Sequence, residues 1–183
     1  MGGRSSRLHL GVPNVPGRMA TLPFCLAFAA ILVFSGCSAE GQSPLAHTRN
    51  SPEDLVQSVL DAVEARDEEA LHGFLLTREE YETWLWPEMP DQQYTPFEFV
   101  WSINETNNRK GLRQLVDRFG GLDLDVVSVT FDEDPEVYES FTLHPGAKVM
   151  VGRSDTGEEG TLPSFDVLVE YGNTWKLMNY DEL

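Results

Sequence analysis

Cysteine is almost absent from this chain, which has two among 183 residues, Cys25 and Cys37. Cys25 lies inside an apolar segment near the N-terminus, and Cys37 lies just after that segment. No cysteine follows Cys37, so disulfide bonds within the remaining chain are excluded and packing must stabilise its fold. A catalytic cysteine paired with a histidine is excluded there for the same reason.

Basic residues are also scarce, with 13 against 30 acidic residues. All the acidic residues follow Cys37, whereas three basic ones precede it, so residues 37–183 carry a formal charge of −20. Such a surface repels phosphate backbones, and we expect no nucleic acid among the partners. The charge either keeps an exported protein soluble or forms an acidic face for a cationic ligand or a basic partner.

Apolar runs long enough to cross a membrane are missing as well. The run at residues 22–34 has 13 uncharged, mostly apolar residues, well short of the roughly 20 that a spanning helix needs. Three arginines precede it (Arg4, Arg7 and Arg18), and Ser35-Gly36 follows it. A basic segment, a short apolar segment and a small-residue cleavage site are typical of a secretory signal.

The end of this segment, Ser35-Gly36-Cys37, resembles the lipobox of bacterial lipoproteins. The resemblance implies a diacylglycerol thioether on Cys37, removal of residues 1–36 as a signal peptide, and a membrane anchor in the cell envelope. Ser38 is compatible with sorting to the outer membrane in a host that has one. Residues 37–50 are small and polar and are expected to form a flexible tether. Residues 51–183 are enough for one domain with a core of its own.

The first half of that domain has helical patterns. Ser51-Pro52-Glu53-Asp54 predicts a helix start, because Ser caps, Pro suits the first turn and acids favour the positive end of the dipole. A short helix is predicted from Asp67, and Thr77 with Glu80 has the form of a capping box for a third, ended by Pro87. We expect core positions at Leu71, Phe74 and Leu75, and at Tyr81, Trp84 and Leu85.

A second capping box, Thr95 with Glu98, predicts a helix carrying Phe97, Val100 and Trp101 on one side. Residues 104–111 are polar and rich in Asn and Gly, which favours a break in that helix. A further helix is predicted over about residues 108–119, with Gly120-Gly121 as its stop.

From Leu122 onward the apolar period changes to two, which indicates strands. A shift of phase near Val127 predicts a β-bulge. Further strands are expected over residues 137–144, 148–153, 164–171 and 174–180, with a hairpin loop over 155–160 and a two-residue turn at Gly172-Asn173. Helices followed by an antiparallel meander predict an α+β domain, with N-terminal helices packed on a curved antiparallel sheet of four or five strands.

Two stretches resemble nuclear transport factor 2-like (SnoaL-like) domains. The opening residues 51–71 read as a helix followed by a second helix of the form x-x-D-x-x-A-L, and residues 172–177 read as the G-x-W-K turn into a final strand. The resemblance implies a cone-shaped fold whose sheet and helices enclose a cavity. That superfamily includes enzymes, binding modules and proteins without activity, so the fold does not select a function.

Few residues are candidates for chemistry. Asp166 and Glu170 share a predicted strand, and a carboxylate facing an apolar cavity would have a raised pKa and could act as a base. His144, before Pro145-Gly146, is a third candidate, although solvent-facing and turn roles are favoured for all three. No histidine has the spacing of a metal site, and the acidic run 132–136 reads as a solvated turn. We therefore expect no metal and no cofactor.

Aromatic residues are concentrated between residues 81 and 101, where there are seven. Core packing is favoured for Trp84, Phe97 and Trp101. Trp86 and Tyr94 flank a proline-broken loop and are candidates for ligand or partner binding, because Trp and Tyr are frequent anchors at interfaces.

Three functions remain open from the sequence. The first is an envelope lipoprotein whose domain binds a small apolar molecule or another envelope protein without catalysis. The second is a SnoaL-like enzyme, an isomerase or hydratase, using Asp166, Glu170 or His144 as its base. The third is an assembly factor that docks a basic partner on an acidic face. The sequence assigns neither the ligand nor the oligomeric state.

Overall fold

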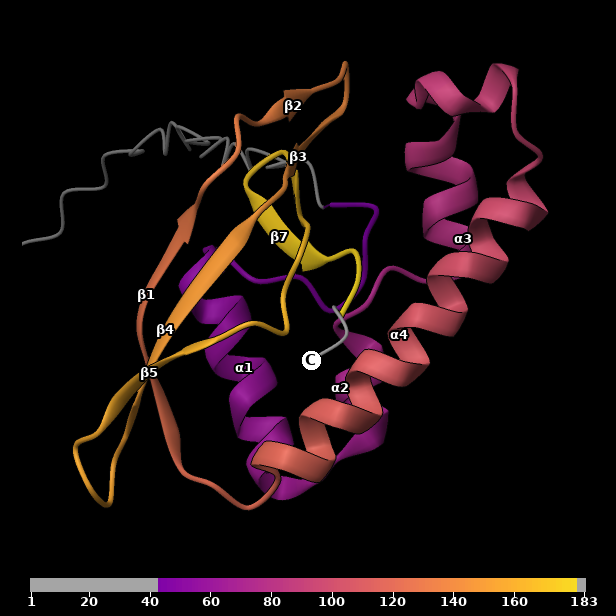
Figure 1. The fold of residues 1–183 in the computed structure, drawn as a ribbon. Coiled ribbons are helices and arrows are strands. Elements are labelled where there is room, and N and C mark those ends of the chain that lie inside the picture. Colours follow the sequence, from indigo (N-terminus) through magenta and orange to yellow (C-terminus); the bar gives the residue numbers. More distant parts are fainter. Residues whose placement is uncertain (1–42, 181–183) are drawn as a thin grey trace, which may run out of the picture. The chain divides into compact units, whose positions relative to one another are not determined.

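The computed structural model describes residues 43–180. The predicted signal peptide and Cys37 lie outside the described residues. The first helix, α1 (Pro52–Ala65), begins as predicted, because the Ser51 side chain accepts a hydrogen bond from the Asp54 N–H (3.0 Å). Its apolar side is buried against β1, α2, α4 and β7 (Figure 1). Within the described part of the chain, no helix is long and apolar enough to cross a membrane.

Short helical segments follow α1. They are α2 (Glu68–Gly73), α3 (Arg78–Glu80), the π-helical turn η1 (Tyr81–Leu85), and the 3₁₀ turns η2 (Trp86–Glu88) and η3 (Pro90–Gln93). The predicted capping box of α3 is confirmed. Tyr81 and Leu85 are buried as expected, but Trp84 is 42% exposed. The wider π turn rotates the third residue away from the buried side, which the α-helical spacing did not anticipate.

Helix α4 (Phe97–Phe119) is a single helix of 23 residues, so the predicted break over residues 104–111 is wrong. The predicted capping box at Thr95 is also wrong, because Pro96 holds the N-cap position and no side chain caps the helix. Tertiary contacts explain the continuity: Asn108 is buried and accepts a hydrogen bond from the Tyr180 N–H (2.8 Å), and Gly111 is buried beside it. Polar residues elsewhere in the stretch face solvent.

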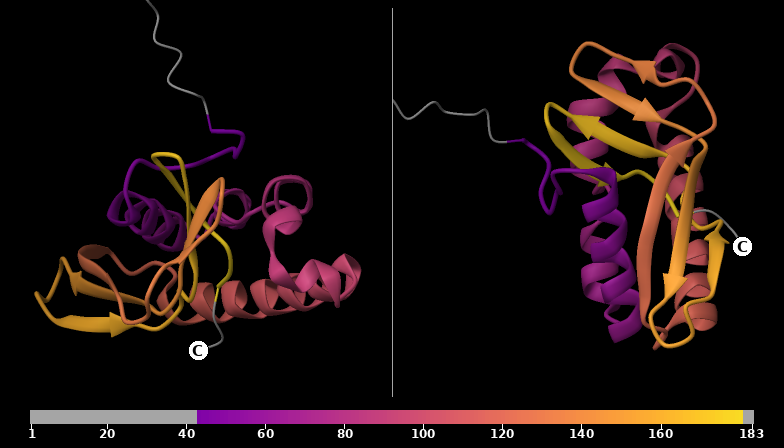
Figure 2. Two further views of the ribbon diagram at one scale, coloured as in Figure 1. Left: turned by 90° about the horizontal axis from the view of Figure 1, so that it is seen from above. Right: turned by 90° about the vertical axis from the view of Figure 1, so that its left-hand side faces the viewer.

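The strands form two antiparallel sheets. One contains β1 (Leu124–Phe131), β4 (Ala147–Arg153) and β5 (Glu159–Leu162), in the order β1-β4-β5. The other contains β2 (Glu136–Val137), β3 (Phe141–His144), β6 (Leu168–Tyr171) and β7 (Thr174–Leu177), in the order β2-β3-β6-β7. The α+β class and antiparallel pairing are confirmed, with the strands divided between two sheets instead of forming the one sheet expected (Figure 2).

Local sheet features follow the sequence closely. The register of β1 against β4 shifts between Val126 and Ser128, which confirms the predicted bulge at Val127. The turn at Gly172-Asn173 joins β6 to β7 with Tyr171 opposite Thr174, as predicted. The predicted strand over 164–171 is shorter, however, because residues 163–167 carry the chain from β5 in one sheet to β6 in the other.

The core divides into two clusters on the two faces of the β2-β3-β6-β7 sheet. The larger cluster joins α1, α2, α4, Leu168 and Leu177 to the β1-β4-β5 sheet. The smaller cluster packs Leu143 and Val169 against η1 and the start of α4. Because alternate residues of a strand point to opposite faces, Leu168 and Val169 belong to different clusters. The four-stranded sheet is therefore covered on both faces.

Candidate functional site

Two of the predicted site residues lie in contact on the four-stranded sheet. His144 ends β3, Glu170 lies on the neighbouring β6, and the His144 Nε2 is 3.0 Å from the Glu170 Oε2. Their side chains are 16% and 33% exposed. The imidazole also contacts the rings of Trp175 and Phe131, at centroid distances of 4.6 Å and 5.1 Å. Antiparallel register across one sheet face brings these residues together.

This pair has the elements of an acid–base unit. An ionised Glu170 only accepts hydrogen bonds, so the proton in the contact belongs to His144 Nε2. The carboxylate then fixes the orientation of the ring and leaves Nδ1 as its second polar atom. The same contact also satisfies two half-buried polar groups beside an aromatic pair, which is a structural role.

The third candidate base is not part of this pair. Asp166 lies between β5 and β6, and its Oδ2 accepts a hydrogen bond from the Asn179 Nδ2 at 3.3 Å. Its backbone carbonyl accepts a hydrogen bond from the Ala147 N–H, which ties it to the sheet junction. The structure therefore brings together Glu170 and His144 but places Asp166 elsewhere.

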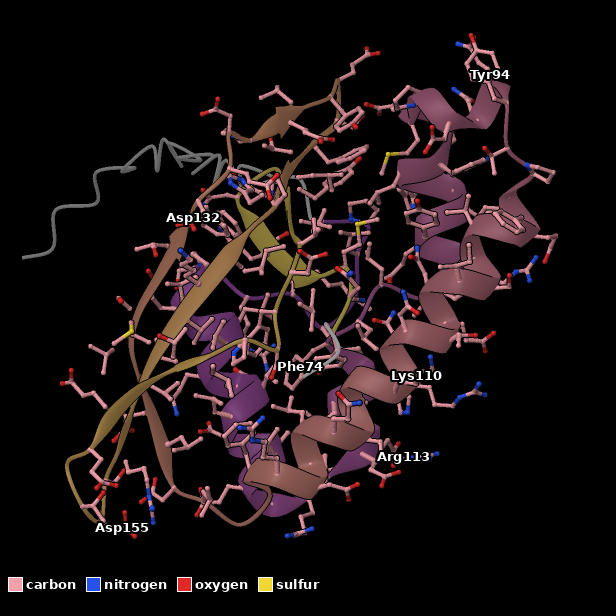
Figure 3. All side chains as sticks on the ribbon, viewed as in Figure 1. Phe74, Tyr94, Lys110, Arg113, Asp132 and Asp155 are labelled. Carbon is pink, nitrogen blue, oxygen red and sulfur yellow. The ribbon has the colours of Figure 1, made fainter. Side chains whose placement is uncertain are left out.

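The two predicted aromatic anchors have different surroundings. Trp86 is half-buried, and its ring contacts Tyr81 (6.2 Å) and Phe97 (5.7 Å) within the smaller core cluster. Tyr94 is 85% exposed beyond η3, and Figure 3 shows it at the tip of this helical region. Trp86 therefore contributes to packing, and Tyr94 is the more available of the two for contact with a partner.

Sequence reasoning missed the most buried ion pair, between Glu80 and Lys176. The Lys176 Nζ lies 2.8 Å and 2.7 Å from the two carboxylate oxygens, and the lysine side chain is fully buried. Burial favours a raised pKa for Glu80, but hydrogen bonds from Lys176, Thr77 and Ala46 outweigh it, so the pKa is lowered. Burial likewise lowers the pKa of Lys176, against the opposing effect of Glu80.

Glu80 also attaches part of the expected tether to the domain. The Ala46 N–H donates to its carboxylate at 2.6 Å, and the preceding Leu45 is buried in the smaller core cluster. Arg49 exchanges backbone hydrogen bonds with Trp175 in both directions, at 2.9 Å and 2.7 Å. Residues 43–50, which the sequence assigned to the tether, thus include a segment that extends the edge of β7.

A groove lies between α2 and α4. It consists of two adjoining hollows of about 300 Å³ and 330 Å³ that share His72 and Arg109. Buried apolar side chains and Trp101 line it, and the polar residues at its edges come from both helices. The residues are His72, Leu75, Leu76, Thr77, Trp101, Glu105, Asn108, Arg109, Leu112, Arg113, Val116, Asp117 and Glu68.

The groove differs in charge from the rest of the protein. Arg109 and Arg113 are exposed along its edge, on the side of α4 where Figure 3 labels Lys110 and Arg113. Within residues 43–180, neither arginine forms a hydrogen bond or an ion pair, although carboxylates of Glu68, Glu105 and Asp117 also line the groove. The groove thus combines an apolar floor with two unpaired cations.

Comparison of the chain with protein-family models, with curated proteins and with solved structures found no match. Among the described residues, no group of three or more His, Cys, Asp or Glu side chains is arranged to hold a metal ion. The assignment of a function therefore depends on the geometry of the groove and of the His144–Glu170 pair.

Proposed function

We propose that this protein is an exported lipoprotein, anchored to the cell envelope by lipid on Cys37, whose domain binds a partner without catalysis. The α2–α4 groove is the observation that carries the binding function. An exposed groove with an apolar floor and a few polar groups at its edges is the usual form of a recognition site. Its two unpaired arginines add charge that a partner could neutralise.

The anchor would hold this groove close to the membrane. Eight residues separate Cys37 from Leu45, which is buried in the domain, and a fully extended chain of that length spans about 28 Å at most. A partner of the groove would therefore be met near the membrane surface, which favours another envelope protein over a molecule distant from the membrane.

Crosslinking in cells tests this proposal. A photoreactive residue replaces Glu105, which lines the groove, in the full chain; a matched residue replaces Thr130, an exposed position on β1. We expect a discrete crosslinked product from position 105 and none from position 130. Replacement of Cys37 by Ser should remove a lipid label and release the protein from the membrane fraction. Equal crosslinking at both positions would contradict the binding site, and an unchanged lipid label would contradict the anchor.

The enzyme alternative remains a second candidate because of the 3.0 Å contact between His144 and Glu170. Native mass spectrometry of residues 38–183 distinguishes the two. A bound small molecule that is lost in Glu170→Gln but kept in Arg109→Glu would support a site at the pair. A molecule lost only in Arg109→Glu would support the groove instead.

A further inference from the structure

The positive charge along the groove is unusual because most other cations of the domain are already engaged. Six of them have carboxylate, hydroxyl or backbone partners: Arg49, Arg66, Arg78, Lys148, Arg153 and Lys176. Arg118 lies over the ring of Phe119, at 5.5 Å, and Lys110 has an interaction of its own. In the described chain, Arg109 and Arg113 remain as exposed guanidinium groups with neither a hydrogen bond nor an ion pair.

The two arginines are placed to act together. They are four residues apart on α4, so they lie on one side of the helix with a separation along its axis of about 6 Å. Leu112 and Val116 are buried on the same side and form the floor beside them. The lining residues extend along α4 from Trp101 to Asp117, about 24 Å of helix.

These dimensions suit an extended peptide. A helix is about 10 Å wide with its side chains, whereas the two hollows together hold only a few side chains. An extended chain advances about 3.3 Å per residue, so about seven residues match the groove. Residues two apart on such a chain point the same way and lie about 6.6 Å apart, close to the spacing of Arg109 and Arg113.

The apolar end of the groove adds a third position. Trp101 is eight residues before Arg109, which corresponds to about 12 Å along α4 and to about four residues of an extended chain. Leu75 lies opposite, on the segment that follows α2. An apolar residue four positions from the nearer carboxylate therefore faces the same wall as the two carboxylates.

We propose that the α2–α4 groove binds an extended acidic segment of a partner protein. Two carboxylate side chains, two residues apart, pair with Arg109 and Arg113, and an apolar side chain four residues away packs against Leu75 and Trp101. The pattern is apolar-x-x-x-acidic-x-acidic, or its reverse, because the groove itself does not fix the direction of the peptide. Guanidinium groups match carboxylates through paired N–H donors. This inference rests on the proposed binding function and specifies its partner.

The overall charge of the protein makes this binding local. With a formal charge of −20 over residues 37–183, the remaining surface repels an acidic segment. Such a segment is therefore attracted where the arginines lie and excluded elsewhere, and its affinity should fall as salt screens the contact.

A selection from random octapeptides displayed on phage, against the full chain in detergent micelles, tests the inference. We expect enrichment of peptides with two acidic residues two apart and an apolar residue four positions away. Their affinity should fall at least about tenfold in Arg109→Glu/Arg113→Glu, which corresponds to about 1.4 kcal/mol. Lys148→Glu/Arg153→Glu is the matched control, because it changes net charge equally at exposed positions away from the groove.

Each outcome decides the inference. Equal loss of affinity in both variants, enrichment of peptides without the acidic pair, or no enrichment would overturn it. Urea unfolding of both variants shows whether the groove variant is folded, and Arg109→Gln provides a milder change if it is not. Crosslinking from position 105 without acidic peptide binding would leave the proposed function standing and reject this partner chemistry.

Discussion

The Glu80–Lys176 pair provides the sharpest test of what stabilises the domain. Lys176→Met removes the ammonium group and keeps most of the side-chain volume. It leaves the Glu80 carboxylate, which is 7% exposed, with the N–H groups of Thr77 and Ala46 but without its counter-ion. Removal of one partner of a buried ion pair costs about 3–5 kcal/mol, because the other charge stays buried and uncompensated.

This loss should be large in a melting experiment. At about 4 °C per kcal/mol for a domain of this size, the Tm of Lys176→Met should fall by roughly 12–20 °C. Glu80→Gln/Lys176→Met should be more stable than the single variant, since it removes both charges and the Gln side chain keeps an acceptor oxygen for the backbone N–H groups.

The pH dependence has a definite sign. The pKa of Glu80 is lowered in the folded protein from an ordinary value of 4.5. Its contribution to stability is therefore fully present above pH 4.5 and is lost as the pH falls through the folded value. In Lys176→Met the ammonium no longer opposes the effect of burial, so the pKa of Glu80 should rise. The difference in stability between the variant and the natural chain should then shrink at acid pH.

Urea unfolding of residues 38–183, followed by tryptophan fluorescence at pH 7 and pH 4, measures these differences. Asp155→Asn is the matched control, because it breaks the exposed contact with Arg153 (2.8 Å) and should change the unfolding free energy by less than about 0.5 kcal/mol. If Lys176→Met is no more destabilising than this control, the pair does not hold the domain together and the reasoning is refuted.

Three further predictions concern other local features. Thr77→Ala removes the α3 cap and should cost about 1 kcal/mol in urea unfolding; an unchanged midpoint would contradict the cap. Gly120→Ala places a Cβ against the Val116 carbonyl oxygen and should cost about 1–3 kcal/mol, whereas Gly160→Ala, with no atom within 4 Å, should cost less than about 0.5 kcal/mol; equal losses would reject the clash. Burial raises the pKa of Tyr180 above its ordinary value of 10, so stability should fall above pH 10, and the fall should be shallower in Tyr180→Phe.

The candidate site shows how far sequence reasoning reached. His144 and Glu170 were both identified as chemical candidates, but their contact depends on the register of β3 against β6, which the sequence alone did not specify. The groove was not predicted, because α2 and α4 are separated in the chain and meet only through the core. The aromatic concentration before α4 was visible in the sequence, yet which rings pack and which face solvent depended on the π turn at Tyr81–Leu85.

The sequence by itself determined the features that depend on a few neighbouring residues. These include the Ser51 cap, the Thr77–Glu80 capping box, the bulge at Val127, the turn at Gly172-Asn173 and the α+β class. Each follows from backbone preference and short-range hydrogen bonding, which act over a few residues of chain.

The tertiary structure decided the features that depend on distant partners. Helix α4 passes through a polar stretch because Asn108 and Gly111 are buried against the core, which outweighs a weak local preference. Glu80 and Lys176 are 96 residues apart in the chain, and each can be buried because the other neutralises it. The same packing leaves Arg109 and Arg113 unpaired beside an apolar floor, which is the physical basis of the proposed binding site.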